Sequence, residues 1–306
     1  MKLVRETKEF KFENTAITLG KFDGMHRGHM SLVKTVTAYK NMGFVPVLFT
    51  FDTSPYEMVK KGATGYLLTR EEKYELCRQA GIEVIVEYPF DSETMHMDAE
   101  DFVREVLIRK LDAKKIVVGE DFCFGKNRMG NVDTLRKMFP DDSLDIKNKI
   151  TYEGNEISST YIKKCINDGD VSRAAAMLGR KYSLSGTIIE GKKIGRTIDF
   201  PTINLKTDEK KILPASGVYA TETLIDGRRY AGVTNIGSNP TVTDEKSIKT
   251  ETHLLGCDEN LYGKTATVKF VMRIRGEKKF DNILQLKEQI SKDVKTASQN
   301  LKKMCP

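Results

Sequence analysis

The sequence has few of the features that mark secreted, membrane-spanning or zinc-binding proteins. Its five cysteines are an odd number at wide, irregular spacings, no two of them have C-x-x-C spacing, and there is no HExxH. No apolar run approaches the roughly 18 residues needed to cross a bilayer, and the N-terminus is charged from Lys2 onward. We therefore expect reduced thiols, no signal peptide, no membrane partner and a cytoplasmic location.

The excess of positive charge is small. With 50 basic and 43 acidic residues among 306, the net charge is +7, and no basic run is interleaved with aromatic residues. This balance suits anionic small molecules at least as well as nucleic acid, so we expect small-molecule substrates and no nucleic-acid partner. The length predicts two domains, each with its own core. Association of identical chains into a homo-oligomer is left open.

The segment 18–30 predicts a phosphate site. A short apolar run that can end a buried strand leads into a glycine-punctuated turn, and His26 and His29 follow where a helix could begin. In such a turn main-chain N–H groups can point at an anion, and both imidazoles would face it from the helix N-terminus. This suits phosphoryl or nucleotidyl transfer. An isolated HxGH is more often one surface histidine and one helix cap.

The first half of the chain alternates strands with helices. Apolar runs predict buried strands at 45–51, 82–86 and 115–118. Helices are expected from the histidines to Gly43, from a capping box at Thr69 to Gly81, and from Asp98 to about Leu111. This order predicts an open parallel α/β sheet of Rossmann-like type, with its ligand at the carboxyl ends of the strands.

Three further segments of this half could contact a ligand. The loops 51–56 and 118–130 both follow predicted strands, and the second contains three glycines and two aromatic rings, Phe122 and Phe124. These rings could hold a ligand ring or pack in the core. The hydroxyl run 158–160 precedes an expected helix over 161–167, which it could cap while donating to a phosphate.

The second half has a different hydrophobic period. After a helix at 171–178 and its stop at Gly179, alternation replaces the helical pattern, which places a domain boundary between 181 and 182. Strands are expected at 182–189, 217–225, 228–236 and 265–275, with Asp226-Gly227 as a hairpin turn. We therefore assign residues 1–181 to an α/β domain and 182–306 to a small antiparallel barrel. An apolar stripe from Ile283 to Leu301 predicts a C-terminal helix that covers the barrel.

Two places in this half carry candidate chemistry. The segment 191–204 combines a glycine turn and basic residues with Thr202 and Asn204, two neutral oxygen ligands that could serve Mg²⁺ alongside ATP phosphates and water. Glu251, on a predicted strand, could accept a proton from an attacking hydroxyl. Alone, a Thr-x-Asn is more often a turn and a strand Glu more often faces solvent.

Together these motifs resemble the bacterial bifunctional riboflavin kinase/FAD synthetase family over nearly the whole chain. Segment 20–29 is similar to the GxFDGxHxGH signature of the adenylylating half, 118–130 to its VGxDFxFGxxxxG segment, and 157–163 to its ISSTxIR motif. Segment 195–204 and the strand Glu resemble the GRxxxFPTxN and ETH-like motifs of the kinase half. The resemblance implies an FMN adenylyltransferase domain followed by a Greek-key riboflavin kinase barrel. Their substrates and products are ATP, riboflavin, FMN and FAD, and Mg²⁺ is the metal.

The resemblance also implies roles for individual residues. The catalytic residues are His26, His29 and Glu251, and the metal ligands are Thr202 and Asn204. The nucleotide-binding residues are Gly20, Phe22, Asp23, Gly24, Gly28, Ser158, Ser159, Thr160, Lys163, Gly191, Gly195 and Arg196. The flavin-binding residues are Asp121, Phe122, Phe124 and Asn127.

Four positions depart from the family's pattern: Cys123 and Lys163 stand where it has Arg, Asp199 where it has Gly, and Asn239 where it has a basic residue. The carboxylate of Asp199 could repel ATP phosphates unless Mg²⁺ or a cation such as Arg196 or Lys193 compensates it. Two alternatives therefore stay open. Either only one half is active, with the kinase in more doubt, or the chain is a flavin-binding regulatory or RNA-interacting protein on the same fold.

Overall fold

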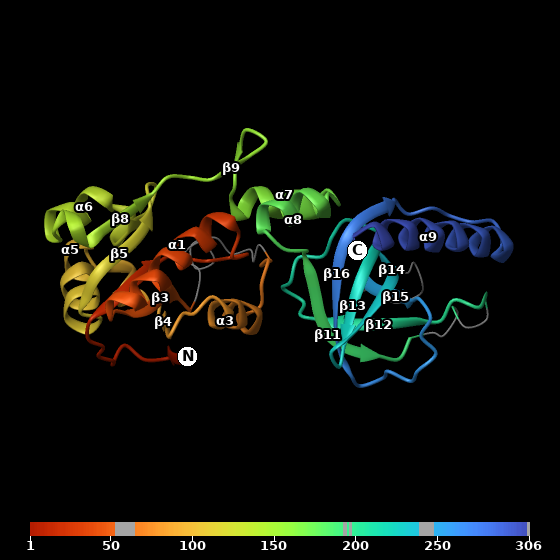
Figure 1. Ribbon diagram of the computed structural model, residues 1–306, viewed down its shortest axis with the longest axis horizontal. Helices are drawn as coiled ribbons and strands as arrows, with labels where there is room; N and C mark the ends of the chain where they lie inside the picture. The colour runs from red at the N-terminus through yellow and green to blue at the C-terminus, as the bar shows by residue number, and fades with distance from the viewer. Residues whose placement is uncertain (53–64, 192–194, 196–197, 239–247, 305–306) are drawn as a thin grey trace. The chain divides into compact units, whose positions relative to one another are not determined.

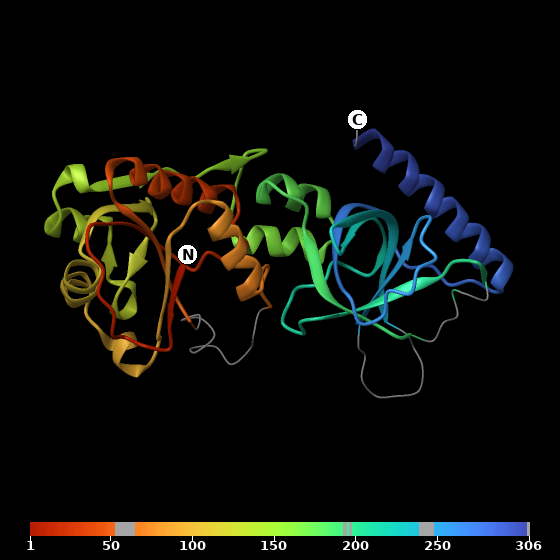
Figure 2. The same ribbon diagram turned by 60° about the horizontal axis from the view of Figure 1, so that its bottom comes forward.

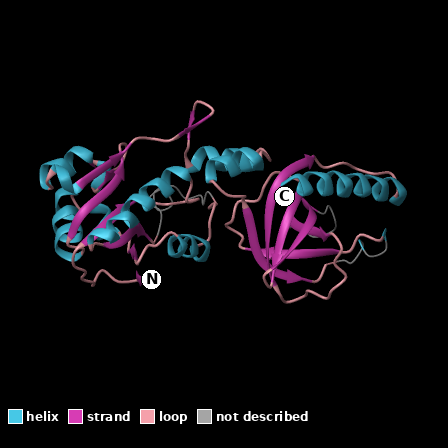
Figure 3. Cartoon of the chain, viewed as in Figure 1, coloured by secondary structure: helices cyan, strands magenta, loops and turns pink. Residues whose placement is uncertain are grey.

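The computed structural model describes residues 1–52, 65–191, 195, 198–238 and 248–304. The chain divides into two compact units, Met1–Ser158 and Ser159–Pro306. Helices and strands are mixed in the first unit, whereas strands dominate the second (Figure 3).

A six-stranded sheet with the order β1-β4-β3-β2-β5-β8 forms the centre of the first unit. Its strands are β1 (Lys2–Arg5), β2 (Thr15–Leu19), β3 (Val45–Phe51), β4 (Val84–Tyr88), β5 (Ala113–Gly119) and β8 (Leu144–Lys147). All neighbouring strands pair in parallel. Every residue of β2 and β4 is buried, as expected of a sheet covered on both faces. The predicted Rossmann-like sheet is confirmed.

Helices cover both faces of this sheet. They are α1 (Arg27–Ala38), continued by a 3-10 turn η1 (Tyr39–Met42), α3 (Arg70–Gln79), α4 (Ser92–His96), α5 (Ala99–Phe102), η2 (Val103–Lys110) and α6 (Val132–Met138). Alternate strand residues feed two separate cores: Ala16 packs with α1 and α3, and Ile17 packs with η2 and α6. The helix expected from Asp98 is present, but η2 is a π-helix.

Short elements complete the first unit. They are β6 (Cys123–Phe124), η3 (Lys126–Arg128), β7 (Gly130–Asn131), η4 (Asp141–Ser143), β9 (Thr151–Tyr152) and β10 (Asn155–Glu156). The expected helix limits are observed where local chemistry fixes them. Gly43 ends the first helix at φ +85°, and Thr69 and Glu72 form a complete capping box at the start of α3.

The strand order reverses at β2, because β3 and β4 lie on one side of it and β5 and β8 on the other. The crevice at the carboxyl end of such a switch point is where open α/β sheets bind ligands. The turn 20–26 leaves β2 at this point, and the loop 120–130 leaves β5 beside it. The loop expected at 51–56 lies outside the described residues from 53 onward.

The second unit is a closed barrel with the order β11-β12-β15-β14-β13-β16 and antiparallel neighbours. Its strands are β11 (Ser183–Ile189), β12 (Thr202–Thr207), β13 (Gly217–Ile225), β14 (Arg228–Ser238), β15 (Ile248–Leu254) and β16 (Thr265–Arg275). The barrel is confirmed (Figure 1), and so is the turn Asp226-Gly227, with φ of +48° and +79°. The strand β12 was not expected, since its first residues read as a turn.

Two helices, α7 (Ser159–Asn167) and α8 (Val171–Leu178), belong to the barrel unit. The Ser172 hydroxyl donates to the Val271 carbonyl at 3.2 Å, and the Arg273 guanidinium donates to the Asp168 and Ser216 carbonyls at 3.3 and 2.7 Å. The compact units therefore divide at 158/159. The boundary at 181/182 was expected from the change in hydrophobic period. It stays a prediction of where one functional domain ends and the next begins.

The C-terminal helix α9 (Ile283–Met304) packs along the outside of the barrel, as Figure 2 shows. Ala297 and Leu301 enter a core shared with three barrel strands, while Ile283, at the start of the expected apolar stripe, is 63% exposed. A buried carboxylate, Asp293, receives two-pronged hydrogen bonds from Arg275 of β16 at 2.9 to 3.2 Å. The middle and end of α9 are thus fixed to the barrel.

Candidate active sites

The two histidines of the HxGH turn form one cluster at the start of α1. His26 is the N-cap residue, and its Nδ1 accepts a long hydrogen bond from the His29 N–H at 3.4 Å. The two imidazoles stack with ring centroids 3.7 Å apart. A neutral imidazole that accepts at Nδ1 carries its proton on Nε2, so His26 can donate to an anion. The cap interpretation is therefore correct for His26 and compatible with a binding role.

Glycine is required in this turn by close packing and by backbone conformation. A Cβ added to Gly28 would lie 3.1 Å from the His26 ring, and one on Gly20 would lie 3.3 Å from the Phe22 ring. Gly24 has φ +85°, and the fully buried Phe22 and Met25 also adopt left-handed conformations. Such strain persists only where the surroundings hold it, so the turn is a rigid support for the histidines.

Asp23 makes a structural contact within the protein. It is 8% exposed, and its Oδ1 accepts a hydrogen bond from the Leu67 N–H at 2.9 Å. This bond ties the turn to the segment that leads into α3. Its predicted contact with nucleotide stays a prediction.

The loop after β5 divides its two aromatic rings between core and surface. Phe124 is 7% exposed and packs against Phe102 at 5.7 Å, so the core interpretation is right for this ring. Phe122 is partly buried and stacks on Phe124 with centroids 5.4 Å apart. Asn127 is exposed in a left-handed conformation, φ +55°. Phe122 is therefore the ring that this loop can offer to a flat ligand.

The acidic residue of this loop already has a cationic neighbour. The Lys149 ammonium lies 3.2 Å from Asp121 and also pairs with Glu156. Its hydrogen bond to Asp121 raises the pKa of Lys149, so the ammonium stays charged at neutral pH. Cys123, which replaces the family's Arg, is half-buried, and its thiol contacts the Asp121 carbonyl at 3.6 Å.

The helix at the hydroxyl run begins two residues earlier than expected. Helix α7 begins at Ser159, so Ser159 and Thr160 lie in its first turn, and Ser158 precedes it. Lys163 follows one turn later on the same helix. The division between the compact units falls directly after Ser158.

In the barrel, strand pairing brings together residues that are far apart in the sequence. Glu251 of β15 lies opposite Asn204 of β12 and opposite Asn235 of β14. The neighbouring pair in the β12–β15 ladder is Thr202 and His253. Because side chains alternate along a strand, these five residues share one face of the sheet.

That face is the outer face of the barrel. The intervening residues Thr252 and Thr234 are fully buried and hydrogen-bonded to each other at 2.8 Å. Glu251 and Asn204 are half-buried, and Asn235 is exposed. Asn235 was not among the predicted site residues. Its position opposite Glu251 follows only from the register.

Two glycines, Gly191 and Gly195, lie directly against the segment that carries these residues. A Cβ on Gly191 would come within 2.2 Å of the Asn204 amide, and one on Gly195 within 2.2 Å of the Phe200 carbonyl. His253 closes the other side, since its Nδ1 lies 2.8 Å from the Pro201 carbonyl oxygen. The remaining predicted residues of this region, Arg196, Lys193 and Asn239, lie outside the described residues.

A lysine of another element lies against the Asp199 carboxylate. Lys287 of α9, 88 residues away, donates to the Asp199 carboxylate at 2.5 Å. Asp199 also has φ +64°, a conformation that glycine adopts at no cost and that Asp tolerates better than most residues. This explains physically why glycine suits the position and why Asp can replace it.

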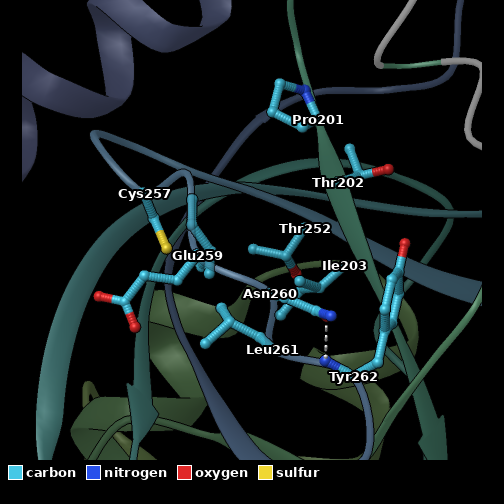
Figure 4. A pocket seen from close by; sticks show the side chains of 10 residues that line it. Pro201, Thr202, Ile203, Thr252, Cys257, Glu259, Asn260, Leu261 and Tyr262 are labelled. Atoms are coloured by element: carbon cyan, nitrogen blue, oxygen red, sulfur yellow. Dashed lines mark hydrogen bonds between the residues drawn. The ribbon is translucent and has the colours of Figure 1, made fainter.

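A pocket opens beside Thr202 (Figure 4). It is lined by Pro201, Thr202, Ile203, Thr252, Leu254, Cys257, Glu259, Asn260, Leu261 and Tyr262. The Tyr262 ring lies on one side, with Cys257 and Glu259 on the other. The turn is held by the Tyr262 N–H, which donates to the Asn260 side chain at 3.3 Å. An aromatic wall with apolar and polar neighbours suits a small planar ligand.

Comparison with known proteins matches each half of the chain separately. The FAD synthetase family matches residues 8–161, and the riboflavin kinase family matches residues 178–301. The bifunctional riboflavin kinase/FMN adenylyltransferase of Buchnera aphidicola subsp. Schizaphis graminum is 35% identical over 308 residues, covering 96% of this chain and 97% of its own. The protein of the same name from Escherichia coli K12 is 33% identical and covers 97% of both chains.

A solved structure also matches over nearly the full length. It is a protein titled macrolide-efflux protein from Streptococcus pneumoniae, with 27% identity, a TM-score of 0.88, and coverage of 97% of this chain and 98% of its own. Among the residues described for the present chain, no helix is both long and apolar enough to span a membrane.

Proposed function

The chain belongs to the bifunctional riboflavin kinase/FMN adenylyltransferase family, and we propose how its residues divide the two reactions. It phosphorylates riboflavin to FMN with ATP and joins FMN to the AMP portion of a second ATP, giving FAD. The observation that carries the residue assignment is the presence of two constellations: stacked imidazoles at the switch point of the sheet and the Asn204–Glu251 pair on the barrel.

In adenylyl transfer the FMN phosphate attacks the α-phosphorus of ATP, and pyrophosphate leaves. Negative charge on the α-phosphoryl oxygens must be stabilised. His26 and His29 donate hydrogen bonds to these oxygens, and the N-terminus of α1 adds its dipole. Gly24 and Gly28 let the backbone and the imidazoles approach the phosphates. The attacking group is the FMN phosphate itself, so no covalent enzyme intermediate is needed.

The remaining contacts of this reaction are assigned by the family resemblance. Phe122 stacks on the flavin ring, Phe124 supports it from the core, and Asp121 and Asn127 supply polar contacts. Ser158, Ser159, Thr160 and Lys163 bind the phosphates of ATP, with Lys163 as a point charge instead of an arginine fork.

In the kinase reaction the 5′-hydroxyl of riboflavin attacks the γ-phosphorus of ATP. Glu251 accepts the hydroxyl proton as general base. Thr202 and Asn204 project from the same face of β12 and offer two hard oxygen donors beside the Glu251 carboxylate, a set that fits Mg²⁺. When bound there, Mg²⁺ would neutralise charge on the ATP phosphates. Gly191 and Gly195 let the chain pass close to Asn204 and Phe200, where a side chain would clash.

The pocket beside Thr202 is assigned to the adenosine part of ATP. Its apolar floor, Ile203, Leu254 and Leu261, and the Tyr262 ring suit a purine. Small molecules are the substrates of both reactions. A cytoplasmic location, the lack of a nucleic-acid partner and the state of self-association stay predictions.

Product analysis tests the assignment directly. With riboflavin and MgATP the purified chain should form FMN and then FAD, and with FMN and MgATP it should form FAD. FMN alone, or FAD only from supplied FMN, would mean that one half is inactive. Tight flavin binding without any product would favour the regulatory alternative. Chelation by EDTA should stop both reactions, and added Mg²⁺ should restore them.

A further inference from the structure

Asp199 is held from outside its own loop. It lies in the turn that leads into β12, and its carboxylate accepts a hydrogen bond from the Lys287 ammonium at 2.5 Å. The side chain of Asp199 is 78% exposed and that of Lys287 45% exposed. The carboxylate therefore lies at the surface, with the cation of another element against it.

This turn determines the position of Thr202, the first residue of β12. Ile198 is 5% exposed and anchors one end, the Phe200 N–H donates to the Gly195 carbonyl at 2.8 Å, and His253 holds the Pro201 carbonyl. Asp199 is the member of the turn with an exposed side chain and a left-handed backbone. A small rotation at Asp199 would therefore move the approach to the metal-ligand position at Thr202.

Lys287 belongs to an element with a fixed position. Asp293, six residues later on α9, is bound by Arg275 of the barrel, which places that anchor about 9 Å along the helix axis from Lys287. Beyond it, Ala297 and Leu301 are buried in the barrel's outer core. The helix can thus hold the Lys287 ammonium in a fixed position beside Asp199.

An uncompensated carboxylate beside the triphosphate would oppose its charge. We propose that Lys287 is a positioning residue of the kinase reaction, which neutralises Asp199 and holds its turn so that Thr202 and Gly195 can receive MgATP. This inference rests on the proposed kinase function of the barrel. It predicts an effect on nucleotide affinity and little effect on the chemical step.

The test compares steady-state FMN formation in variants of the full chain. Lys287→Met keeps the length of the side chain and removes its charge, and should raise the KM for MgATP roughly three- to tenfold, with kcat changed less than about twofold. Adding Asp199→Asn to Lys287→Met should return the KM to within about twofold of its original value, because Asn keeps the shape and tolerates the left-handed backbone. Lys292→Met, at an exposed lysine of the same helix, is the matched control and should leave KM unchanged.

Two results would overturn the proposal. An unchanged KM in Lys287→Met would show that the ion pair has no effect on nucleotide binding. A raised KM that persists in the double variant would show that the uncompensated charge of Asp199 is not what weakens nucleotide binding. If the original chain forms no FMN, the kinase assignment fails separately. Isothermal titration calorimetry with MgADP then still tests the inference: the Kd should rise in Lys287→Met, return in the double variant and stay unchanged in Lys292→Met.

Discussion

His26 and His29 stack with their ring centroids 3.7 Å apart, directly over the first turn of α1. The residue between them that makes this arrangement possible is Gly28, where a Cβ would lie 3.1 Å from Cε1 and Nδ1 of His26. That distance is tighter than ordinary van der Waals contact, so any side chain must push the imidazole aside. The stacked geometry of the two histidines thus depends on glycine at position 28, which has no side chain.

We expect Gly28→Ala to lower FAD formation from FMN by about tenfold, because displacing a positioned group by a fraction of an ångström weakens its contact in the transition state. The midpoint of thermal unfolding should change little, since the greater helix preference of alanine offsets the cost of displacing the imidazole. His26→Ala removes the ring and should abolish FAD formation. Lys34→Ala, at an exposed position of α1, is the control.

FMN formation from riboflavin should stay intact in both His26→Ala and Gly28→Ala. If His26→Ala eliminated both reactions in a folded protein, the assignment of the two activities to separate sites would be wrong.

Glu251→Gln should reduce FMN formation by roughly 10²–10⁴-fold, because a general base contributes on that order. The amide keeps the size of the side chain opposite Asn204 but cannot accept the proton. FAD formation from supplied FMN should continue at its original rate. Glu209→Gln, at an exposed turn residue, controls for the loss of a charge. A near-normal kinase rate would show that Glu251 only positions riboflavin.

Thiol labelling can test the adenosine pocket. Cys257 is half-buried in the lining of this pocket, whereas Cys77 is fully buried, and burial raises the pKa of the Cys77 thiol to about 12. At pH 8 iodoacetamide should therefore modify Cys257 and Cys123 and leave Cys77 unmodified. MgADP should slow the modification of Cys257 by fivefold or more and leave that of Cys123 unchanged, as measured by peptide mass spectrometry. Equal rates with and without MgADP would place the nucleotide elsewhere.

The helices α7 and α8 should be needed for a stable barrel unit. Val171, Ala174 and Met177 of α8 are fully buried, and α7 and α8 are joined to the barrel through Arg273 and Ser172. A fragment of residues 159–306 should therefore unfold at a higher temperature than a fragment of residues 183–306, as followed by circular dichroism. Both fragments should phosphorylate riboflavin if the shorter one folds. Equal midpoints would mean that the helices add nothing to barrel stability.

Acid should remove one specific contribution to the stability of the first unit. The Lys8 ammonium and the Thr94 N–H lower the pKa of Asp91 to about 2, and Asp91 caps α4 through the Thr94 N–H at 2.9 Å. A lowered pKa in the folded state means that the contribution is complete above the unfolded value near 4 and is lost as the pH falls through about 2. Asp91→Ala should cost about 1 kcal/mol at pH 7, mostly from the lost cap, since solvent screens the half-exposed ion pair.

The difference between the original chain and Asp91→Ala should shrink steadily below pH 4 in urea unfolding. Asp141→Ala, which removes an exposed carboxylate from another part of the same unit, should show no such trend. A difference that stays constant down to pH 2 would contradict the assigned cause.

Local chemistry in the sequence determined the features that need only near neighbours. The capping box at Thr69, the left-handed stop at Gly43 and the hairpin turn at Asp226-Gly227 are observed as predicted, because each depends on hydrogen bonds or backbone freedom within a few residues. Periodicity likewise predicted the parallel sheet and the barrel. The position of the HxGH turn followed from its place after a buried strand.

Tertiary structure alone decided the contacts between residues that are far apart in the sequence. The segment 202–204 reads locally as a turn, but becomes a strand because β15 supplies the ladder that places Asn204 beside Glu251. Lys287 of α9 lies against Asp199 although the two residues are 88 apart in the sequence, and Phe124 entered the core while Phe122 remained at its edge. No sequence period encodes which distant residue will lie within hydrogen-bonding distance, because that distance is set by how the strands close and where the helices pack against them.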